Sequence, residues 1–153
     1  MAVVLLAVAT IILDQITKIE VRRILPEGAY HKVIGDFFRL THFENDGAAF
    51  STFSGQNLFL ITLPIVVVIV AAVYMARHKN CHMLLKVAVG FIVGGGIGNL
   101  IDRAIWGSVT DMFSFSIFPA IFNVADIAVV IGCFLLVLYV IKYEKLENID
   151  DGK

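Results

Sequence analysis

Two aspartates, Asp111 and Asp126, are ionisable residues in strongly apolar surroundings. Asp126 is the single charged residue of the apolar stretch 121–141, and an ionisable group inside a membrane span is costly enough to suggest a function. Asp111 lies in the alternating stretch 109–117, on the face that carries Val109 and Phe113. Two carboxyl groups held close together share one proton, so one can activate water while the other polarises a carbonyl. This is the chemistry of an aspartic protease, which the spacing permits without requiring that the two residues meet.

A structural role is the main alternative for these charges. Asp126 could form an ion pair with Arg103 or Lys18 and so hold helices together. Asn99 and Arg103 are four residues apart, so on a helix they share a face, while Asp102 between them would hold the helix end. That face could position a substrate or could carry a salt-bridge cluster at a helix end. Asn123 precedes Asp126 by about one helical turn and shares its face.

Other reactive residues fit known chemistries less well. His78, Cys81 and His82 form a compact cluster that lacks a fourth metal ligand. Ser51 has no histidine that the sequence places beside it, which makes a serine hydrolase a poor match. We therefore expect no metal site, and a pair of carboxyl groups that activates water needs no organic cofactor either.

The composition indicates that these residues work in a lipid environment. The chain has 153 residues, of which 59% are hydrophobic and 16% are charged, with a formal net charge of −1. A soluble domain carries about 45–50% apolar and ~25% charged residues, so a soluble globule is excluded. The absence of a basic surplus argues against a nucleic-acid partner.

Four apolar stretches predict an α-helical integral membrane protein with four transmembrane helices, since a span needs roughly 20 apolar residues. The expected spans are residues 1–19, 57–76, 84–101 and 121–141. The first could also be the core of a cleaved signal peptide, but it lacks the basic region that precedes such a core. Gly90, Gly94 and Gly98 repeat every fourth residue, which predicts close helix packing.

The polar remainder predicts a small extracytoplasmic β-rich element. The loop 20–56 contains a stretch, 30–43, that is dense in Val, Ile, Phe and Thr between turn signals, and it reads as one or two strands. The alternation over 109–117 predicts another strand. No linker or repeat divides the chain, so residues 1–153 are expected to form a single membrane-embedded domain.

Four spans place the unusual polar residues on one side of the membrane, because the ends of the helices that carry them all lie there. Basic residues outside the spans are equally numerous on both sides, but Arg77 and Lys79 directly follow the second span. Since short basic segments next to spans stay inside, we expect both termini in the cytoplasm. The polar cluster then faces outward.

Five short motifs follow one another along most of the chain. They are LDQITK (13–18), NDGAAFS (45–51), GGGIGNLIDR (94–103), GSVTDM (107–112) and FNVAD (122–126). In this order they resemble the motifs of bacterial lipoprotein signal peptidases, the type II signal peptidases. The family is a four-helix membrane aspartic peptidase of the bacterial cytoplasmic membrane. It removes signal peptides from prolipoproteins, cleaving before a cysteine that already carries diacylglycerol.

The resemblance implies roles for residues within these motifs. It makes Asp111 and Asp126 the catalytic dyad, in agreement with the residues singled out above. It also implies that a further set supports the dyad or positions substrate: Asp14, Lys18, Asn45, Gly95, Asn99, Arg103 and Asn123. The implied partners are a lipid-modified prolipoprotein and membrane lipids. Met112 is a small departure, since an aromatic residue is common there.

Two other classes remain as alternatives. A small transporter or proton carrier would use Asp126, Arg103 and Asp14 as relay groups, but it would distribute polar residues through the membrane's thickness. A structural helix-packing subunit would tolerate replacement of the carboxylates.

Overall fold

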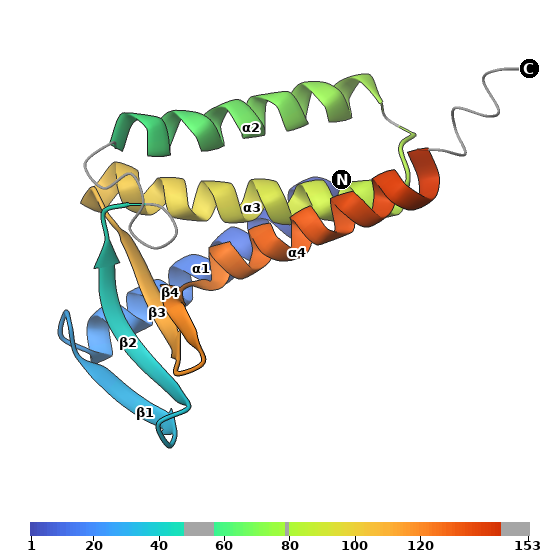
Figure 1. Cartoon of the computed structure of the whole chain (residues 1–153). Coiled ribbons are helices and arrows are strands. Elements are labelled where there is room, and N and C mark those ends of the chain that lie inside the picture. The colour runs from blue at the N-terminus through green and yellow to red at the C-terminus, as the bar shows by residue number, and fades with distance from the viewer. Residues whose placement is uncertain (48–56, 79, 145–153) are drawn as a thin grey trace, which may run out of the picture.

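The computed structural model describes residues 1–47, 57–78 and 80–144. Four helices dominate it: α1 (Ala2–Ile24), α2 (Asn57–Arg77), α3 (Met83–Trp106) and α4 (Val124–Tyr139), the last continued by a π-helical turn (Val140–Glu144). All four are long and apolar enough to cross a membrane, and many of their large apolar side chains are exposed. The predicted multi-pass membrane fold is thus confirmed (Figure 1).

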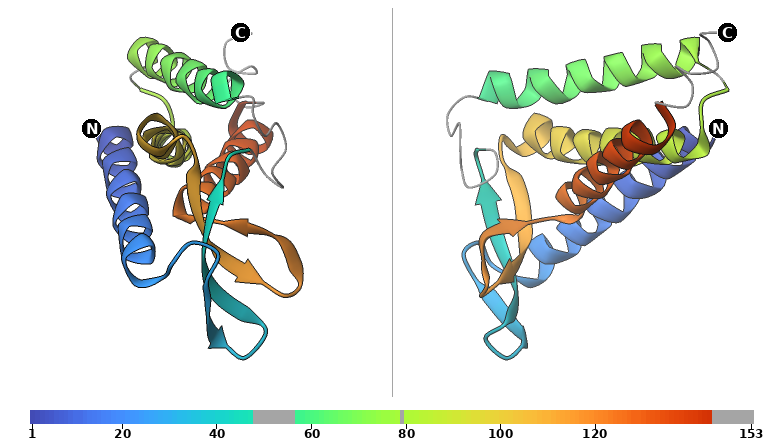
Figure 2. Two further views of the ribbon diagram at one scale, coloured as in Figure 1. Left: turned by 90° about the vertical axis from the view of Figure 1, so that its left-hand side faces the viewer. Right: turned by 45° about the vertical axis from the view of Figure 1, so that its right-hand side comes forward.

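α3 is the central helix, and α1, α2 and α4 all pack against it (Figure 2). The glycine series of α3 packs closely against a neighbouring helix, as predicted, and the structure identifies that helix as α1. A Cβ at Gly94 would lie 2.7 Å from the Thr10 Cβ, and one at Gly98 would lie 2.7 Å from the Asp14 carboxylate. Side chains at these positions would therefore push the two helices apart.

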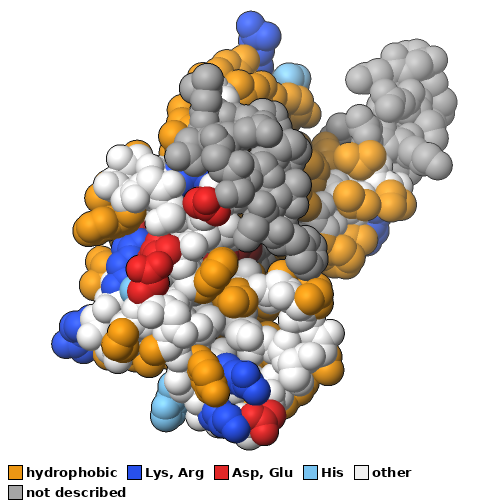
Figure 3. All heavy atoms as spheres, turned by 60° about the vertical axis from the view of Figure 1, so that its left-hand side comes forward, with side chains coloured by type: hydrophobic (Ala, Val, Ile, Leu, Met, Phe, Trp, Pro, Cys, Tyr) orange, Lys and Arg blue, Asp and Glu red, His pale blue; other side chains and the backbone are white. Residues whose placement is uncertain are grey.

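A four-stranded antiparallel sheet covers one end of the helices. Its strands are β1 (Tyr30–Ile34), β2 (Phe38–Asn45), β3 (Val109–Phe115) and β4 (Phe118–Phe122), in the order β1-β2-β3-β4. The acidic side chains visible in Figure 3 lie at this end of the molecule. The register places Asn45 opposite Val109 and Phe43 opposite Asp111. Asn45 is therefore a diagonal neighbour of Asp111, close enough for contact.

Three boundaries differ from the sequence-based expectation. α1 extends to Ile24 rather than ending at residue 19, and α3 extends to Trp106 rather than residue 101. Residues 121–122 belong to β4 instead of opening the last span, so α4 begins at Val124. Asn123 sets that start because its side chain accepts a hydrogen bond from the Asp126 N–H, while the Asp126 carboxylate accepts one from the Asn123 N–H.

Candidate active site

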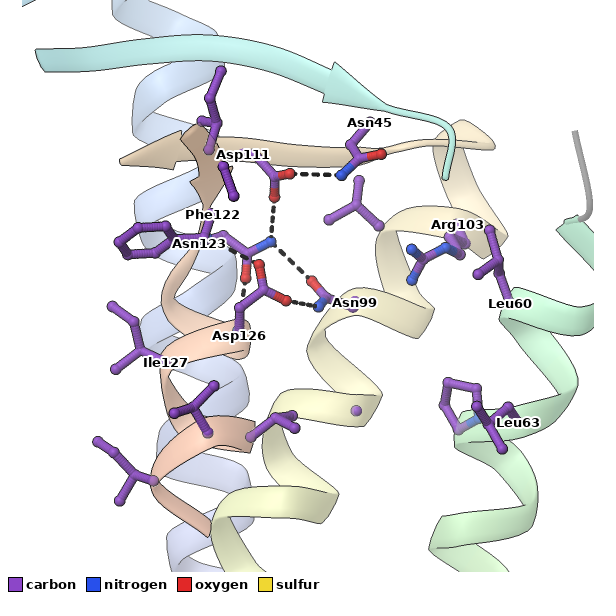
Figure 4. A pocket seen from close by; sticks show the side chains of 18 of the residues that line it. Asn45, Leu60, Leu63, Asn99, Arg103, Asp111, Phe122, Asn123, Asp126 and Ile127 are labelled. Carbon is purple, nitrogen blue, oxygen red and sulfur yellow. Dashed lines mark hydrogen bonds between the residues drawn. The ribbon is translucent and has the colours of Figure 1, made fainter. Parts of the chain in front are cut away.

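A cavity of about 610 Å³ lies where α2, α3, α4 and the sheet meet. Its polar end is formed by Asn45, Asn99, Arg103, Asp111, Asn123 and Asp126 (Figure 4). Its remaining walls are apolar, with Leu60 and Leu63 from α2 facing Ile127 and Val130 from α4. The cavity thus has polar side chains at one end and apolar walls between the helices.

Asp111 approaches this cavity from β3 and is almost fully buried, with 2% of its surface exposed. Its Oδ1 accepts a hydrogen bond from Asn123 Nδ2 at 2.6 Å, and its Oδ2 accepts one from Asn45 Nδ2 at 2.9 Å. Burial, and then the nearby charge of Asp126, raise the pKa of Asp111 to about 7. Near neutral pH this carboxyl group therefore gains and loses its proton readily.

Asp126 approaches the same space from the first turn of α4. Its Oδ1 accepts a hydrogen bond from Asn99 Nδ2 at 2.8 Å, and its Oδ2 accepts one from the Asn123 N–H at 3.2 Å. Among the described residues, no lysine or arginine lies within 4.0 Å of either dyad carboxyl. The structural alternative for Asp126, an ion pair with Arg103 or Lys18, is therefore not found among the described residues.

Asn123 links the two carboxyl groups. Its side-chain amide donates to Asp111, and its backbone N–H donates to Asp126. Figure 4 shows Asp111 and Asp126 on opposite sides of this residue, pointing toward the same space. The structure thus brings together the two carboxylates that the sequence left unconnected.

The amide groups of the three asparagines are each held in one orientation. The Asn45 oxygen accepts the Gly47 N–H at 2.9 Å, and the Asn123 oxygen accepts the Asp126 N–H at 2.9 Å. The Asn99 oxygen accepts a hydrogen bond from the Lys18 ammonium at 2.9 Å. With each oxygen occupied, each NH₂ group points toward a dyad carboxylate.

Lys18 forms a buried ion cluster with Asp14 and Asp102. The Lys18 Nζ lies 2.8 Å from Asp14 Oδ2 and 3.0 Å from Asp102 Oδ2, and all three side chains are fully buried. Together with its hydrogen bond to Asn99, Lys18 uses all three of its ammonium protons. Lys18 therefore joins the ion cluster to the dyad through one neutral amide.

The two acids of this cluster hold the backbone beside the dyad. Asp14 Oδ1 accepts the N–H of Ala125, which directly precedes Asp126, at 2.9 Å. Asp102 Oδ2 accepts the N–H of Thr110, which directly precedes Asp111, at 3.2 Å. The start of α4 and the start of β3 are thus fixed to one charged cluster between α1 and α3.

Gly95 and Arg103 complete the expected set. A Cβ at Gly95 would overlap the Ala125 carbonyl oxygen, so this glycine allows α3 to approach α4 next to the dyad. The Arg103 guanidinium lines the cavity and donates to the Gly47 carbonyl oxygen at 2.8 Å. All nine residues implied by the motifs therefore lie at the cavity or directly behind it.

Sequence reasoning underestimated Asp102, which was expected only to hold a helix end. It missed Gln15, whose amide donates to Gly98 O and to Asp102 Oδ1, both at 3.1 Å. It also missed Thr110, whose hydroxyl accepts from Arg22 Nε at 2.7 Å. Gln15 and Asp102 lie inside recognised motifs, but their partners are distant in sequence. Ser51 and residues 48–50 of the second motif lie outside the described residues.

The comparison with known protein families agrees with this geometry. The sequence model of signal peptidase II matches residues 6–142. The chain belongs to the signal peptidase II family. It is accordingly a hydrolase of the aspartic peptidase type.

Individual relatives cover nearly the whole chain. A lipoprotein signal peptidase of Caldanaerobacter subterraneus subsp. tengcongensis is 42% identical over 137 residues, covering 89% of this chain and 92% of the relative. One from Clostridium tetani is 37% identical over 150 residues, covering 95% and 96%. A bacterial membrane enzyme solved by the in meso method at 2.3 Å superposes with a TM-score of 0.85 at 31% identity, covering 92% of this chain and 87% of that one. The fold and the enzyme class of the signal peptidase II family therefore apply here.

Proposed function

We propose that this protein removes the signal peptide from diacylglyceryl-modified prolipoproteins, cleaving before the lipidated cysteine with Asp111 and Asp126 as a catalytic dyad. Residues 1–153 act in this proposal as one membrane-embedded peptidase domain. The observation that carries it is the pair of carboxyl groups bridged by Asn123 at the polar end of an apolar cavity. Relatives named lipoprotein signal peptidase support the choice of substrate.

The chemistry follows from one proton shared by the pair. The ionised aspartate takes a proton from water, whose oxygen attacks the scissile carbonyl carbon. The protonated aspartate gives its proton to the carbonyl oxygen, which produces a neutral tetrahedral intermediate. Collapse of this intermediate returns a proton to the leaving amine and breaks the C–N bond. A pKa of about 7 for Asp111 supports a singly protonated pair near neutral pH.

The surrounding residues position the reactants. Asn45, Asn99 and Asn123 hold the carboxyl groups by hydrogen bonds, and the Arg103 guanidinium faces the cavity as a donor for substrate carbonyl groups. The apolar wall between Leu63 and Ile131 would hold the lipid-bearing substrate while its acyl chains stay in the bilayer. No step requires a metal or an organic cofactor.

Substitution of the dyad tests the mechanism. Asp111→Asn and Asp126→Asn should each lower kcat on a diacylated prolipoprotein by about 10²–10⁴-fold, the usual contribution of general acid–base catalysis. Asp36→Asn is the matched control, because Asp36 is exposed at the far end of the sheet, where it pairs with Lys32 and Arg39. Unchanged thermal unfolding would show that each variant still folds. Near-wild-type turnover by either dyad variant would refute the mechanism.

The substrate is tested separately. The wild-type protein should cleave the diacylated prolipoprotein and leave its unmodified precursor uncut in the same micelles. Equal turnover of both would contradict the requirement for lipid while leaving the dyad intact.

We further propose that both termini are cytoplasmic in the bacterial inner membrane, which places the sheet outside. The support is Arg77 and Lys86 at the helix ends opposite the sheet. In a variant without Cys81 and Cys133, a cysteine introduced at Asp36 should react with an impermeant thiol reagent in intact cells. If a cysteine introduced at Asn80 reacts and one introduced at Asp36 does not, the orientation is the opposite of the one proposed.

A further inference from the structure

A second cavity, of about 830 Å³, lies between α1 and α2 with α3 as its floor. Figure 2 shows α1 and α2 on different sides of α3, and the cavity occupies the angle between them. Its walls are mainly apolar and include Val4, Val8, Ala72, Met75, Val89 and Val93. It shares no lining residue with the cavity of the dyad. We call it the α1–α2 groove.

The groove has the length of one membrane leaflet. On α3 its lining runs from Met83 to Ile97. The part from Lys86 to Ile97, which lies between the charged residue and the inner end, is about 16 Å long at ~1.5 Å per residue. The hydrocarbon core of a bilayer is roughly 30 Å thick, so this length is about half of it. The groove therefore matches an acyl chain that starts at the interface and ends near the bilayer centre.

Lys86 gives the interfacial end of the groove a positive charge. It lies in the first turn of α3 and is half-buried, and among the described residues its side chain has no hydrogen bond or ion pair. None of the described residues that line the groove is acidic. The sequence from 57 to 101 contains no Asp or Glu at all. An ammonium group at the edge of the hydrocarbon that has no acidic partner in the chain attracts an anionic group from outside it.

An anion at this position would meet further favourable groups. Arg77 ends α2 directly after Ala76, a groove residue, and forms no ion pair among the described residues. Lys86 itself lies at the N-terminal end of α3, where the helix dipole favours negative charge. A long Lys side chain can lay its aliphatic stem along an apolar wall and present its ammonium at the interface.

We propose that the α1–α2 groove binds one anionic glycerophospholipid, with its phosphate on Lys86 and an acyl chain along the Val89–Val93–Ile97 stripe of α3. The length of the apolar groove fits a lipid acyl chain, and Lys86, which has no acidic partner, favours a negatively charged headgroup. This site lies at the opposite end from the dyad and does not depend on the proposed reaction.

Binding can be measured by native mass spectrometry of the delipidated full-length protein, titrated with phosphatidylglycerol or with phosphatidylcholine. We expect one phosphatidylglycerol to bind about fivefold more tightly than phosphatidylcholine. Lys86→Gln should remove that preference, because a basic residue near an anionic headgroup contributes about fivefold in affinity. Lys142→Gln is the matched control, since it removes the same charge after α4, outside the groove.

A second pair of variants tests the acyl-chain part. Ala72→Leu places a larger side chain in the groove and should weaken both lipids. Ala9→Leu makes the same change on an exposed face of α1 outside the groove and should change neither. Unchanged phosphatidylglycerol binding by Lys86→Gln would overturn the proposal. So would equal losses in Lys142→Gln and Lys86→Gln, or in Ala9→Leu and Ala72→Leu.

Discussion

Lys18 is the residue whose loss should be most informative, because one ammonium holds three buried partners. Its Nζ contacts Asp14 at 2.8 Å, Asp102 at 3.0 Å and Asn99 at 2.9 Å. Lys18→Met keeps the approximate volume of the side chain and removes the charge. It leaves two fully buried carboxylates, of which Asp102 keeps Arg22 at 3.3 Å and Asp14 keeps only hydrogen bonds.

The structure sets the size of the effect. Removing one partner of a buried ion pair costs about 3–5 kcal/mol, because the remaining charge stays buried. Lys18→Met should lower the free energy of unfolding by this amount. Activity should fall by about 10²-fold in kcat/KM among molecules that still fold, since Asn99 loses the contact that orients it toward Asp126.

Unfolding in mixed detergent–SDS micelles and cleavage of a diacylated prolipoprotein measure the two effects. Lys18→Arg should not restore activity, because a planar guanidinium cannot make the three contacts of the ammonium. Lys18→Met combined with Asp14→Asn should cost less than the sum of the single changes, since the carboxylate that Lys18→Met leaves without a cation is gone. The control Lys32→Met breaks an exposed pair with Asp36 and should leave both measurements almost unchanged. Strict additivity of the double variant, or wild-type stability of Lys18→Met, would refute the reasoning.

Three further outcomes follow from the site. Cleavage should decline as pH rises through about 7, because Asp111 then gives up the shared proton; Asn45→Leu removes a hydrogen bond that lowers this pKa, so the decline in its pH–rate profile should move to higher pH. Gly95→Ala should destabilise the fold by about 1–3 kcal/mol through overpacking. The control Gly96→Ala should not, because its Cβ would meet its nearest neighbour at 3.9 Å. Equal unfolding curves for the two variants would contradict the close approach at Gly95. Arg103→Lys should raise KM more than it lowers kcat, because a single ammonium cannot reproduce the directed guanidinium contacts, and a pure kcat effect would argue against a positioning role.

Local signals predicted the helices, and they singled out the two carboxylates that line one cavity in the structure. Asp126 stands out as an acid in an apolar helix, and Asp111 stands out on the apolar face of an alternating strand. Both signals depend only on sequence neighbours within about one helical turn or one strand of the residue itself. The antiparallel register that brings Asn45 to Asp111 is not local, because it depends on pairing β2 with a strand more than sixty residues away.

The errors in the prediction have two physical origins. β4 merges with the apolar run of α4, and a short apolar run does not by itself distinguish a strand from a helix. The capping pattern of Asn123 and Asp126 was the local signal that could have separated them. Asp102 was underestimated because its partners Lys18 and Thr110 come from another helix and a strand. Which face of α3 meets α1 is decided by packing across the whole bundle.

The neutral amides around Asp111 and Asp126 orient these carboxyl groups without placing a positive charge in contact with them. A carboxylate in direct contact with an ammonium is stabilised as an anion and becomes a weaker base. Here Lys18 forms its ion pairs with Asp14 and Asp102, and it is connected to Asp126 by hydrogen bonds only through Asn99. The arrangement can hold an aspartate rigidly without placing a cation in contact with it.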